Sequence, residues 1–419
     1  MPEIFPFRAL RYAQRDVTPL VTQPYDRIDS RLQREYGERH RHNFVRVDKP
    51  AGTHEDAAAT LREWERTGVM VRDPRPALYA YHQLHGGTVR KGLTALVRLD
   101  DRIHKHEETH TGPKADRLEM IKATRAHISH VFLLYSDPQK TVNRILDEAS
   151  AWPPILEGRD DFGETHRVWR VDDPNAVASI RGVLATKDAI IADGHHRYET
   201  ACTYRNLMRA QGAACEGPES FENVLATLVN MDDGLTIYGT HRVIHGLARV
   251  DLSRIGEFTV SELGERVEPF FDVSEPGDVK AALAAQSTPA FGLVEPGRAP
   301  RLLVVRDVVR AAAQVKAAKS EAWRSLDVNI LHTVILDGML GVTPEHTAKE
   351  MHVDYLRSAD EAAERVRSGR AQCAFLVNPV RMDQIRSIVA QGERFPQKTT
   401  DFYPKLLSGL LLCPLNFLG

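Results

Sequence analysis

The sequence predicts a mixed α/β (α+β) fold built from more than one domain. Its 419 residues exceed what one domain usually holds, and 42% of them are hydrophobic, enough for substantial cores. Short apolar runs typical of buried strands alternate with segments of helical periodicity. We expect an N-terminal α/β domain over 1–150, a middle segment over 151–247, and an additional α+β C-terminal domain over 248–419 whose final loop returns to the functional site.

The N-terminal part is expected to begin with short strand-like pieces and turns. Residues 21–26 are typical of an extended loop, because Pro24 disfavours helix before it, and alternation over 43–47 predicts a strand. The expected elements that follow are a helix over 54–68, a strand pair over 77–82 and 91–97 around Gly86-Gly87, a helix after Pro113, a strand over 131–135 and a helix over 139–150.

The middle and C-terminal parts continue the alternation of strands and helices. The middle segment is expected to hold strands over 165–171, 189–193 and 223–229 and a helix over 174–184. The C-terminal part is expected to hold helical segments over 277–286 and 302–337 and strands over 290–294 and 373–377.

Composition narrows the possible partners. The formal net charge is −2, so no global basic field is available to hold nucleic acid or an anionic membrane. The N-terminus lacks a signal pattern, the apolar runs are too short to span a membrane, and the four cysteines are widely spaced. We therefore expect a reduced cytoplasmic protein with a small-molecule substrate and no nucleic-acid or membrane partner, while the oligomeric state stays open.

The segment 189–201 carries the clearest functional signal. Four apolar residues predict a buried strand, Asp193-Gly194 a sharp turn, and the following spacing a helix. This order points backbone N–H groups at an anion. His195-His196 and Arg197 add donors in the first helical turn, where the helix dipole disfavours cations, so a bound phosphate or carboxylate would explain them. Alternatively, Asp193 is only an N-cap, the histidines lie on the surface, and Arg197 pairs with an acid.

The stretch His106-Glu107-Glu108-Thr109-His110 spells H-E-x-x-H, the signature of zinc proteases. Zinc needs both histidines on one face of a continuous helix, and a third ligand. Gly112-Pro113 would break such a helix almost at once. We therefore expect no zinc-protease chemistry and assign no metal ligand.

The same region favours phosphoryl chemistry. Two acids precede the Gly112-Pro113 turn, and two cations three residues apart follow it on one helix face. Acids suit Mg²⁺ or a substrate proton, and cations suit phosphate oxygens; the alternative is a solvated helix end with weak ion pairs. The candidate catalytic residues are Glu107, Glu108, Lys114, Asp116, Arg117 and Asp193, and the candidates for holding a cofactor are Gly194, His195, His196, Arg197 and Lys398.

Lys398 is included because of the segment 397–405. It holds two lysines, two threonines and one aspartate in nine residues, and Pro404 rigidifies it. We predict that it folds back near Lys114, Arg117 and His195, with Lys398 on a phosphate or substrate carboxylate. The alternative is a polar loop that leads into the closing apolar run.

Eight motifs stand in order along the chain: FPFRALRY (5–12), QPYD (23–26), HEET (106–109), GPKADRL (112–118), FLLYSD (132–137), DGHHRYETA (193–201), PQKT (396–399) and FYPKL (402–406). Together they closely resemble a bacterial family catalogued as domain of unknown function 1015. The DGHHR box also resembles that of the ParB/sulfiredoxin superfamily, which includes free-serine kinases.

This resemblance implies a ParB/sulfiredoxin-like nucleotide-binding core. It implies that Gly194, His195, His196 and Arg197 hold nucleotide phosphates, with ATP or ADP and Mg²⁺ as cofactors, and that a phosphoryl group passes to a small hydroxylated metabolite, L-serine being the first candidate. Two alternatives stay open: a nucleotide-binding or hydrolysing switch protein of the ParB type, and a phosphatase or hydrolase that uses the same cluster.

Overall fold

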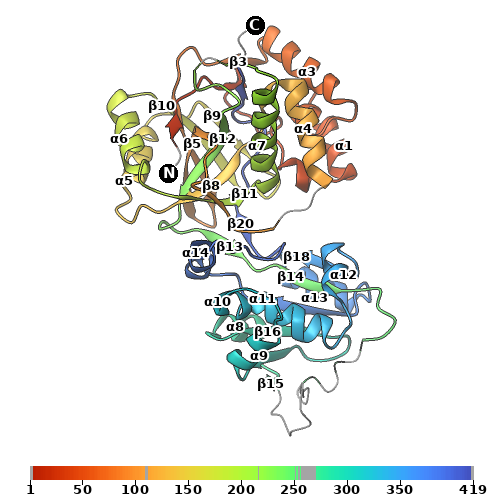
Figure 1. The fold of residues 1–419 in the computed structure, drawn as a ribbon. Helices are drawn as coiled ribbons and strands as arrows, with labels where there is room; N and C mark the ends of the chain where they lie inside the picture. Colours follow the sequence, from red (N-terminus) through yellow and green to blue (C-terminus); the bar gives the residue numbers. More distant parts are fainter. Residues whose placement is uncertain are drawn as a thin grey trace. The chain divides into compact units, whose positions relative to one another are not determined.

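The chain forms two compact units, each described here by itself (Figure 1). The computed structural model describes residues 3–108, 112–215, 217–250, 252, 255 and 270–416. Unit 1 comprises Met1–Lys105, Thr109–Thr236 and Pro404–Gly419, and unit 2 comprises His106–Glu108 and Ile237–Tyr403. The C-terminal segment therefore belongs to the same unit as the N-terminal one. The three-part division expected from the sequence stays a prediction.

Unit 1 is built on a mixed sheet, with nine strands among the described residues in the order β6-β11-β8-β12-β5-β4-β10-β9 and β1 paired to β5. The strands are β1 (Ile4–Phe5), β4 (Leu78–His85), β5 (Thr88–Arg98), β6 (Ile103–Lys105), β8 (Val131–Tyr135), β9 (Leu156–Arg159), β10 (Thr165–Val171), β11 (Ala189–Asp193) and β12 (Asn223–Asn230). Two short pairs accompany it, β2 (Leu10–Tyr12) with β3 (Met70–Arg72) and β7 (Ala126–His127) with β21 (Cys413–Pro414).

One face of this sheet packs against helices. Leu93, Ala95 and Leu133 belong to an apolar core that also contains residues of α5 (Thr141–Ala149), α6 (Pro174–Leu184) and α7 (His195–Ala210). Helix α4 (Gly112–Thr124) packs on α7, and α3 (His54–Arg66) packs on α4, as Figure 1 shows. The remaining helical segments of unit 1 are η1 (Tyr25–Arg27), α1 (Ser30–Arg39) and α2 (Val45–Asp48).

The two ends of the chain contact the opposite face. Tyr79, Tyr81 and Gln83 alternate along β4 with residues of the helix-covered core, so they point to the other side. The Tyr79 hydroxyl accepts the backbone N–H of Ala9 at 3.1 Å, and the Tyr81 hydroxyl accepts that of Leu407 at 3.3 Å. The C-terminal segment is thereby fixed against the sheet.

Unit 2 contains a second, antiparallel sheet. Among the described residues it has six strands in the order β15-β17-β16-β19-β14-β18. They are β14 (His241–Ile244), β15 (Phe271–Ser274), β16 (Ala290–Val294), β17 (Arg301–Val305), β18 (Val353–Leu356) and β19 (Cys373–Val377); β13 (Thr236–Tyr238) pairs separately with β20 (Asp401–Tyr403). The helices are α8 (Val279–Ala284), α9 (Val308–Gln314), α10 (Glu321–Arg324), α11 (Asp327–Ile330), the π-helical η3 (Leu331–Asp337), α12 (Pro344–Ala348), α13 (Ala359–Arg367) and α14 (Met382–Ala390).

The predicted mixed α/β class with an additional α+β unit is confirmed. Two segment predictions are wrong. Residues 43–47 do not form a strand: Val45–Asp48 is helix α2, and the Asn43 side chain accepts the N–H of Val45 at 3.0 Å, a local bond that competes with strand pairing. Within the expected helix over 302–337, Arg301–Val305 is strand β17, because its apolar residues are buried between β15 and β16. None of the helices in the described ranges is long and apolar enough to cross a membrane.

Candidate functional site

A β-bulge near the end of β11 turns Asp193 away from the helix-covered face of the sheet. Ile191 pairs with Leu133, and both side chains belong to the core under the helices, whereas Asp193 pairs with Phe132 after a register shift. Because successive strand residues point to opposite faces, Asp193 shares the side of Phe132. Arg90, which lies over the Phe132 ring, also binds the C-terminal segment. The bulge thus directs Asp193 to the face that the chain ends contact.

Gly194 forms the turn between β11 and α7. Its φ of +85° lies in the left-handed region, which glycine adopts without strain. A Cβ atom there would lie 2.9 Å from Nε of Arg197, so glycine also lets Arg197 fold back over the turn. No side chain caps α7 at this residue, whereas Asp173 caps α6. The start of α7 therefore combines backbone donors and a positive dipole end with no side-chain cap, a geometry that favours an anion.

Asp193, Arg197 and Lys405 form an ion cluster, called the Asp193 cluster below. One carboxylate oxygen accepts Lys405 Nζ at 3.0 Å, and the other accepts Arg197 Nη2 at 2.5 Å. The side chains of Lys405 and Arg197 are only 8% and 9% exposed. Burial alone would raise the pKa of Asp193, but the charges of Lys405 and Arg197 hold that pKa far below its usual range. One carboxylate thus holds two cations, and the cluster carries a net positive charge.

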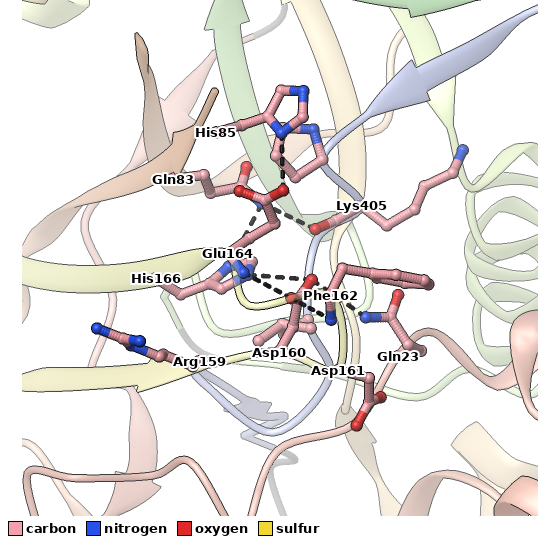
Figure 2. A network of polar contacts seen from close by, with 12 residues as sticks. Gln23, Gln83, His85, Arg159, Asp160, Asp161, Phe162, Glu164, His166 and Lys405 are labelled. Carbon is pink, nitrogen blue, oxygen red and sulfur yellow. Dashed lines mark hydrogen bonds and ion pairs between the residues drawn. The ribbon is translucent and has the colours of Figure 1, made fainter. Parts of the chain in front are cut away.

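A buried polar network holds the backbone of Lys405 (Figure 2). Gln83 Nε2 donates to the Lys405 carbonyl at 2.8 Å, and Arg90 donates to the side-chain oxygen of Gln83 and to the carbonyl of Pro404. Figure 2 shows the Lys405 side chain extending away from this network. The network to β4 fixes the backbone of Lys405 on one side, and its ammonium group binds Asp193 on the other.

The network continues into β10 and the loop before it. His166 Nδ1 lies 2.7 Å from the Tyr81 hydroxyl. Its Nε2 lies 3.6 Å from Asp160 (Figure 2). Burial lowers the pKa of His166 although Asp160 opposes the shift, so the ring is a neutral hydrogen-bonding partner near pH 7. Through Tyr81 and Gln83, this network positions the C-terminal segment.

Arg117 is the centre of a second ion cluster in unit 1. Its Nη1 donates to the Asp48 carbonyl at 2.9 Å and to Oδ1 of Asp48 at 3.2 Å, and its Nη2 donates to Asp116 at 2.6 Å. The guanidinium lies 4.1 Å from the centre of the Tyr25 ring. Asp116 also binds His54 at 2.9 Å. Two carboxylates and an aromatic ring therefore fix Arg117, which is itself buried.

Tyr25 links the two clusters electrostatically. Burial raises the pKa of its hydroxyl to about 12, and Arg197 and Arg117 both oppose that rise. The neighbouring Asp26 is exposed, and its charge acts on Arg197, Asp48 and Tyr25. The 3₁₀ turn η1 thus holds a buried tyrosine and an accessible carboxylate whose charge acts on the buried Arg197.

Glu107 and Lys398 lie together in unit 2. The Glu107 carboxylate accepts the backbone N–H of Lys398 at 2.8 Å and the Thr400 hydroxyl at 3.2 Å. His106 Nε2 lies 2.7 Å from that hydroxyl. Lys398 has a φ of +58°, and its Nζ lies 3.5 Å from Glu350, each side chain being half-exposed. Glu107 therefore fixes the backbone of the loop that presents Lys398.

The residues predicted from the sequence are divided between the two units. Unit 1 brings together Asp116 with Arg117, and Asp193 with Arg197 at the start of α7, where Gly194, His195 and His196 also stand; unit 2 holds Glu107, the exposed Glu108 and Lys398. The side chain of Lys114 lies outside the described residues. That Lys398 lies near Lys114, Arg117 and His195 stays a prediction.

Sequence reasoning missed several participants. Tyr25 and Asp26 belong to the QPYD motif, which supported the family resemblance but received no role. Lys405 belongs to the segment predicted to fold back, and it contacts Asp193. Asp48 has no local signal, because only the fold brings it to Arg117.

A metal site built by the protein alone is not found in the described part of the chain, where no group of three or more His, Cys, Asp or Glu could hold an ion. His106–Glu108 are not helical, and Glu107 forms a β-bridge with Phe395, so this part of the H-E-x-x-H stretch departs from the zinc-protease geometry. His110 lies outside the described residues.

The fold and these clusters define a mixed α/β protein with a positively charged strand–turn–helix element. The chain belongs to the family described as "Protein of unknown function (DUF1015)", whose profile matches residues 4–329. The resemblance inferred from the eight motifs is thereby confirmed. A search of curated protein sequences finds no match.

Three solved structures illustrate the structural likeness. A free serine kinase in complex with AMP is 13% identical over 77% of this chain and 88% of its own, with a TM-score of 0.35. A conserved hypothetical protein from Pyrococcus furiosus is 14% identical over 78% and 94%, with a TM-score of 0.34. SbnI with a C-terminal truncation, from Staphylococcus aureus, is 11% identical over 76% and 86%, with a TM-score of 0.36. Because the identities and TM-scores are this low, the likeness says nothing about the chemistry of this chain.

Proposed function

We propose that this protein is a nucleotide-dependent phosphotransferase that acts on a small hydroxylated metabolite, with L-serine as the first acceptor to test. The observation that carries the proposal is the start of α7, where Gly194 opens an uncapped helix beside the net positive Asp193 cluster. Backbone donors, a helix dipole and buried cations at one place suit the phosphates of ATP or ADP. His195 and His196 stand in the same helical turn.

Arg197 and Lys405 are assigned to the phosphates and to the charge that develops during transfer. Asp193 is assigned to orienting these two cations, because both of its oxygens are engaged and its lowered pKa makes it a poor proton acceptor. Arg117 is the third cation of the proposal, and its charge is already paired with Asp116 and Asp48 beside Tyr25.

Asp26 is the proposed proton acceptor, because it is exposed and acts electrostatically on Arg197. In the transfer step the acceptor oxygen forms a bond to phosphorus, the bond from phosphorus to the nucleotide oxygen breaks, and the acceptor proton passes to Asp26. Mg²⁺ would bind mainly through the nucleotide phosphates, together with one or two carboxylates, as it commonly does in such sites. Glu107, Glu108, Lys114 and Lys398 enter the proposal on sequence grounds.

Calorimetric titration of ATP and ADP into the Arg197→Ala variant tests the proposal. Losing a hydrogen bond to a charged group should weaken nucleotide binding by about 1.5–3 kcal/mol, roughly 10- to 150-fold. The matched control is Arg209→Ala, because Arg209 lies near the other end of α7, also pairs with an acid, Glu222, and is 56% exposed. Unchanged nucleotide affinity in folded Arg197→Ala would refute the assignment.

A further inference from the structure

Unit 2 contains a pocket at the ends of three neighbouring strands of its sheet. Strands β14 and β16 both run antiparallel to β19, so they begin where β19 ends. Arg242 at the start of β14, Thr399, and residues from 286–288, 326–328 and 377–381 line the pocket there. Three strand ends thus meet at one place, and a basic residue stands among the lining side chains.

Arg242 is buried, with 1% of its surface exposed, and its partners are neutral. Its Nη1 donates to the Thr240 carbonyl, its Nε to His332 Nε2 at 3.2 Å, and its Nη2 to the Lys398 carbonyl at 3.4 Å. Among the described residues, no ion pair joins Arg242 to a carboxylate. These contacts use three of the five N–H donors of the guanidinium, so two remain for a further acceptor.

The surroundings compensate the charge of Arg242 only in part. Burial lowers the pKa of His332 to about 3, so this partner is neutral. Burial also lowers the pKa of Arg242 to about 10, which leaves the guanidinium protonated near neutral pH. The negative charge of Glu107 opposes that shift, but Glu107 is not bonded to Arg242 directly. A buried cation without a directly bonded counter-ion is costly in a folded protein. A bound anion would supply that counter-ion.

We propose that the unit 2 pocket binds a small anion that bears one carboxylate or phosphate group, with Arg242 as its anchor. Ser287 and Thr288 are exposed lining residues and offer hydroxyl groups, and Arg381, which pairs with Asp383, also lines the pocket. Asp327 also lines the pocket, and its carboxylate would repel a second anionic group on the ligand. The pocket is therefore suited to a ligand with a single anionic group.

The test is a calorimetric titration of the full chain with inorganic phosphate in one arm and acetate in the other. Both arms use the Arg197→Ala background, which weakens the phosphate site proposed in unit 1. We expect saturable binding with one site per chain in at least one arm, and the arm that binds identifies the anionic group. The substitution Arg242→Met should weaken this binding by about tenfold or more, because a charge-assisted bond is lost.

Two further variants keep the test decisive if Arg242→Met does not fold. Thr288→Trp places a large side chain at an exposed residue of the pocket lining and leaves Arg242 itself unchanged, so it should also abolish binding. Arg370→Met removes an exposed arginine of unit 2 and should leave binding unchanged. The proposal is overturned if neither anion binds, or if binding survives Thr288→Trp. Nucleotide titration of Thr288→Trp in the wild-type background reports separately on the proposed function, which does not depend on this pocket.

Discussion

Asp193 holds two buried cations beside the start of α7, and its charge is central to that arrangement. The substitution Asp193→Asn leaves Arg197 and Lys405 without their shared carboxylate. Removing one partner of a buried ion pair typically costs about 3–5 kcal/mol. We expect Asp193→Asn to lower the free energy of unfolding by that amount near neutral pH, as measured by chemical denaturation.

The pH dependence of this effect has a definite sign. Because the folded-state pKa of Asp193 is lowered, its ionised form contributes stability that is fully present above the unfolded value of about 4 and is lost as the pH falls further. The difference in unfolding free energy between wild type and Asp193→Asn should therefore shrink below pH about 4. A difference that stays constant into that range would show that the Asp193 charge does not contribute as described.

At the level of the element, Gly194 has two roles that can be separated. Gly194→Ala places a residue at φ +85° and a Cβ 2.9 Å from Arg197 Nε. Gly212→Ala, just beyond the other end of α7, has a φ of +69° and open space around the added Cβ. Each should cost about 1–2 kcal/mol of stability, because an L-residue is strained in the left-handed region.

Only Gly194→Ala should also weaken nucleotide binding, because only there must Arg197 move. Thermal unfolding and calorimetric titration of the two variants measure both effects. Equal loss of nucleotide affinity in both variants would indicate a general effect of destabilising α7 instead of a local one at the turn.

The elements that local sequence predicts well are those with a strong local signal. Strands such as β8 and β10 are recognisable because apolar runs are bounded by turns, and the start of α7 is recognisable from Asp193-Gly194 and the basic residues after it. Residues 43–47 mislead because a four-residue helix is too short to show its period. At β17, pairing with two neighbouring strands overrides the helical spacing.

The candidate site could be predicted only where its members are close in sequence. Arg197 and Asp193 are four residues apart in the sequence and form an ion pair. A pairing of Arg197 with an acid is one of the alternatives that the sequence leaves open. Lys405 reaches Asp193 from 212 residues away, and Asp48 reaches Arg117 across 69 residues. Such contacts depend on the order of the strands and the path of the chain through the fold, which no local sequence pattern encodes.

At the level of the whole molecule, the proposal gives unit 2 a part in the reaction through Lys398. The chain leaves unit 1 after Lys105, contributes His106–Glu108 to unit 2, and returns. If Lys398 contacts a substrate, Lys398→Ala should lower turnover while the melting temperature stays nearly unchanged, because a half-exposed lysine contributes little to stability. Steady-state kinetics and thermal unfolding measure the two effects.

The matched control for Lys398→Ala is Lys280→Ala. Lys280 is also a half-exposed lysine of unit 2 that pairs with an acid, Asp360. Its substitution should change neither turnover nor melting temperature. If Lys398→Ala turns over as fast as Lys280→Ala, Lys398 has no part in the reaction.

The most direct measurement is a product assay on the purified full chain. The protein is incubated with Mg²⁺, with ATP or ADP, and with L-serine or a panel of other hydroxylated metabolites, and the products are identified by mass spectrometry. We predict a phosphorylated acceptor whose formation requires the acceptor and falls strongly in Arg197→Ala but not in Arg209→Ala. Nucleotide hydrolysis with no phosphorylated acceptor, or product formation unaffected by Arg197→Ala, would contradict the proposed phosphotransferase.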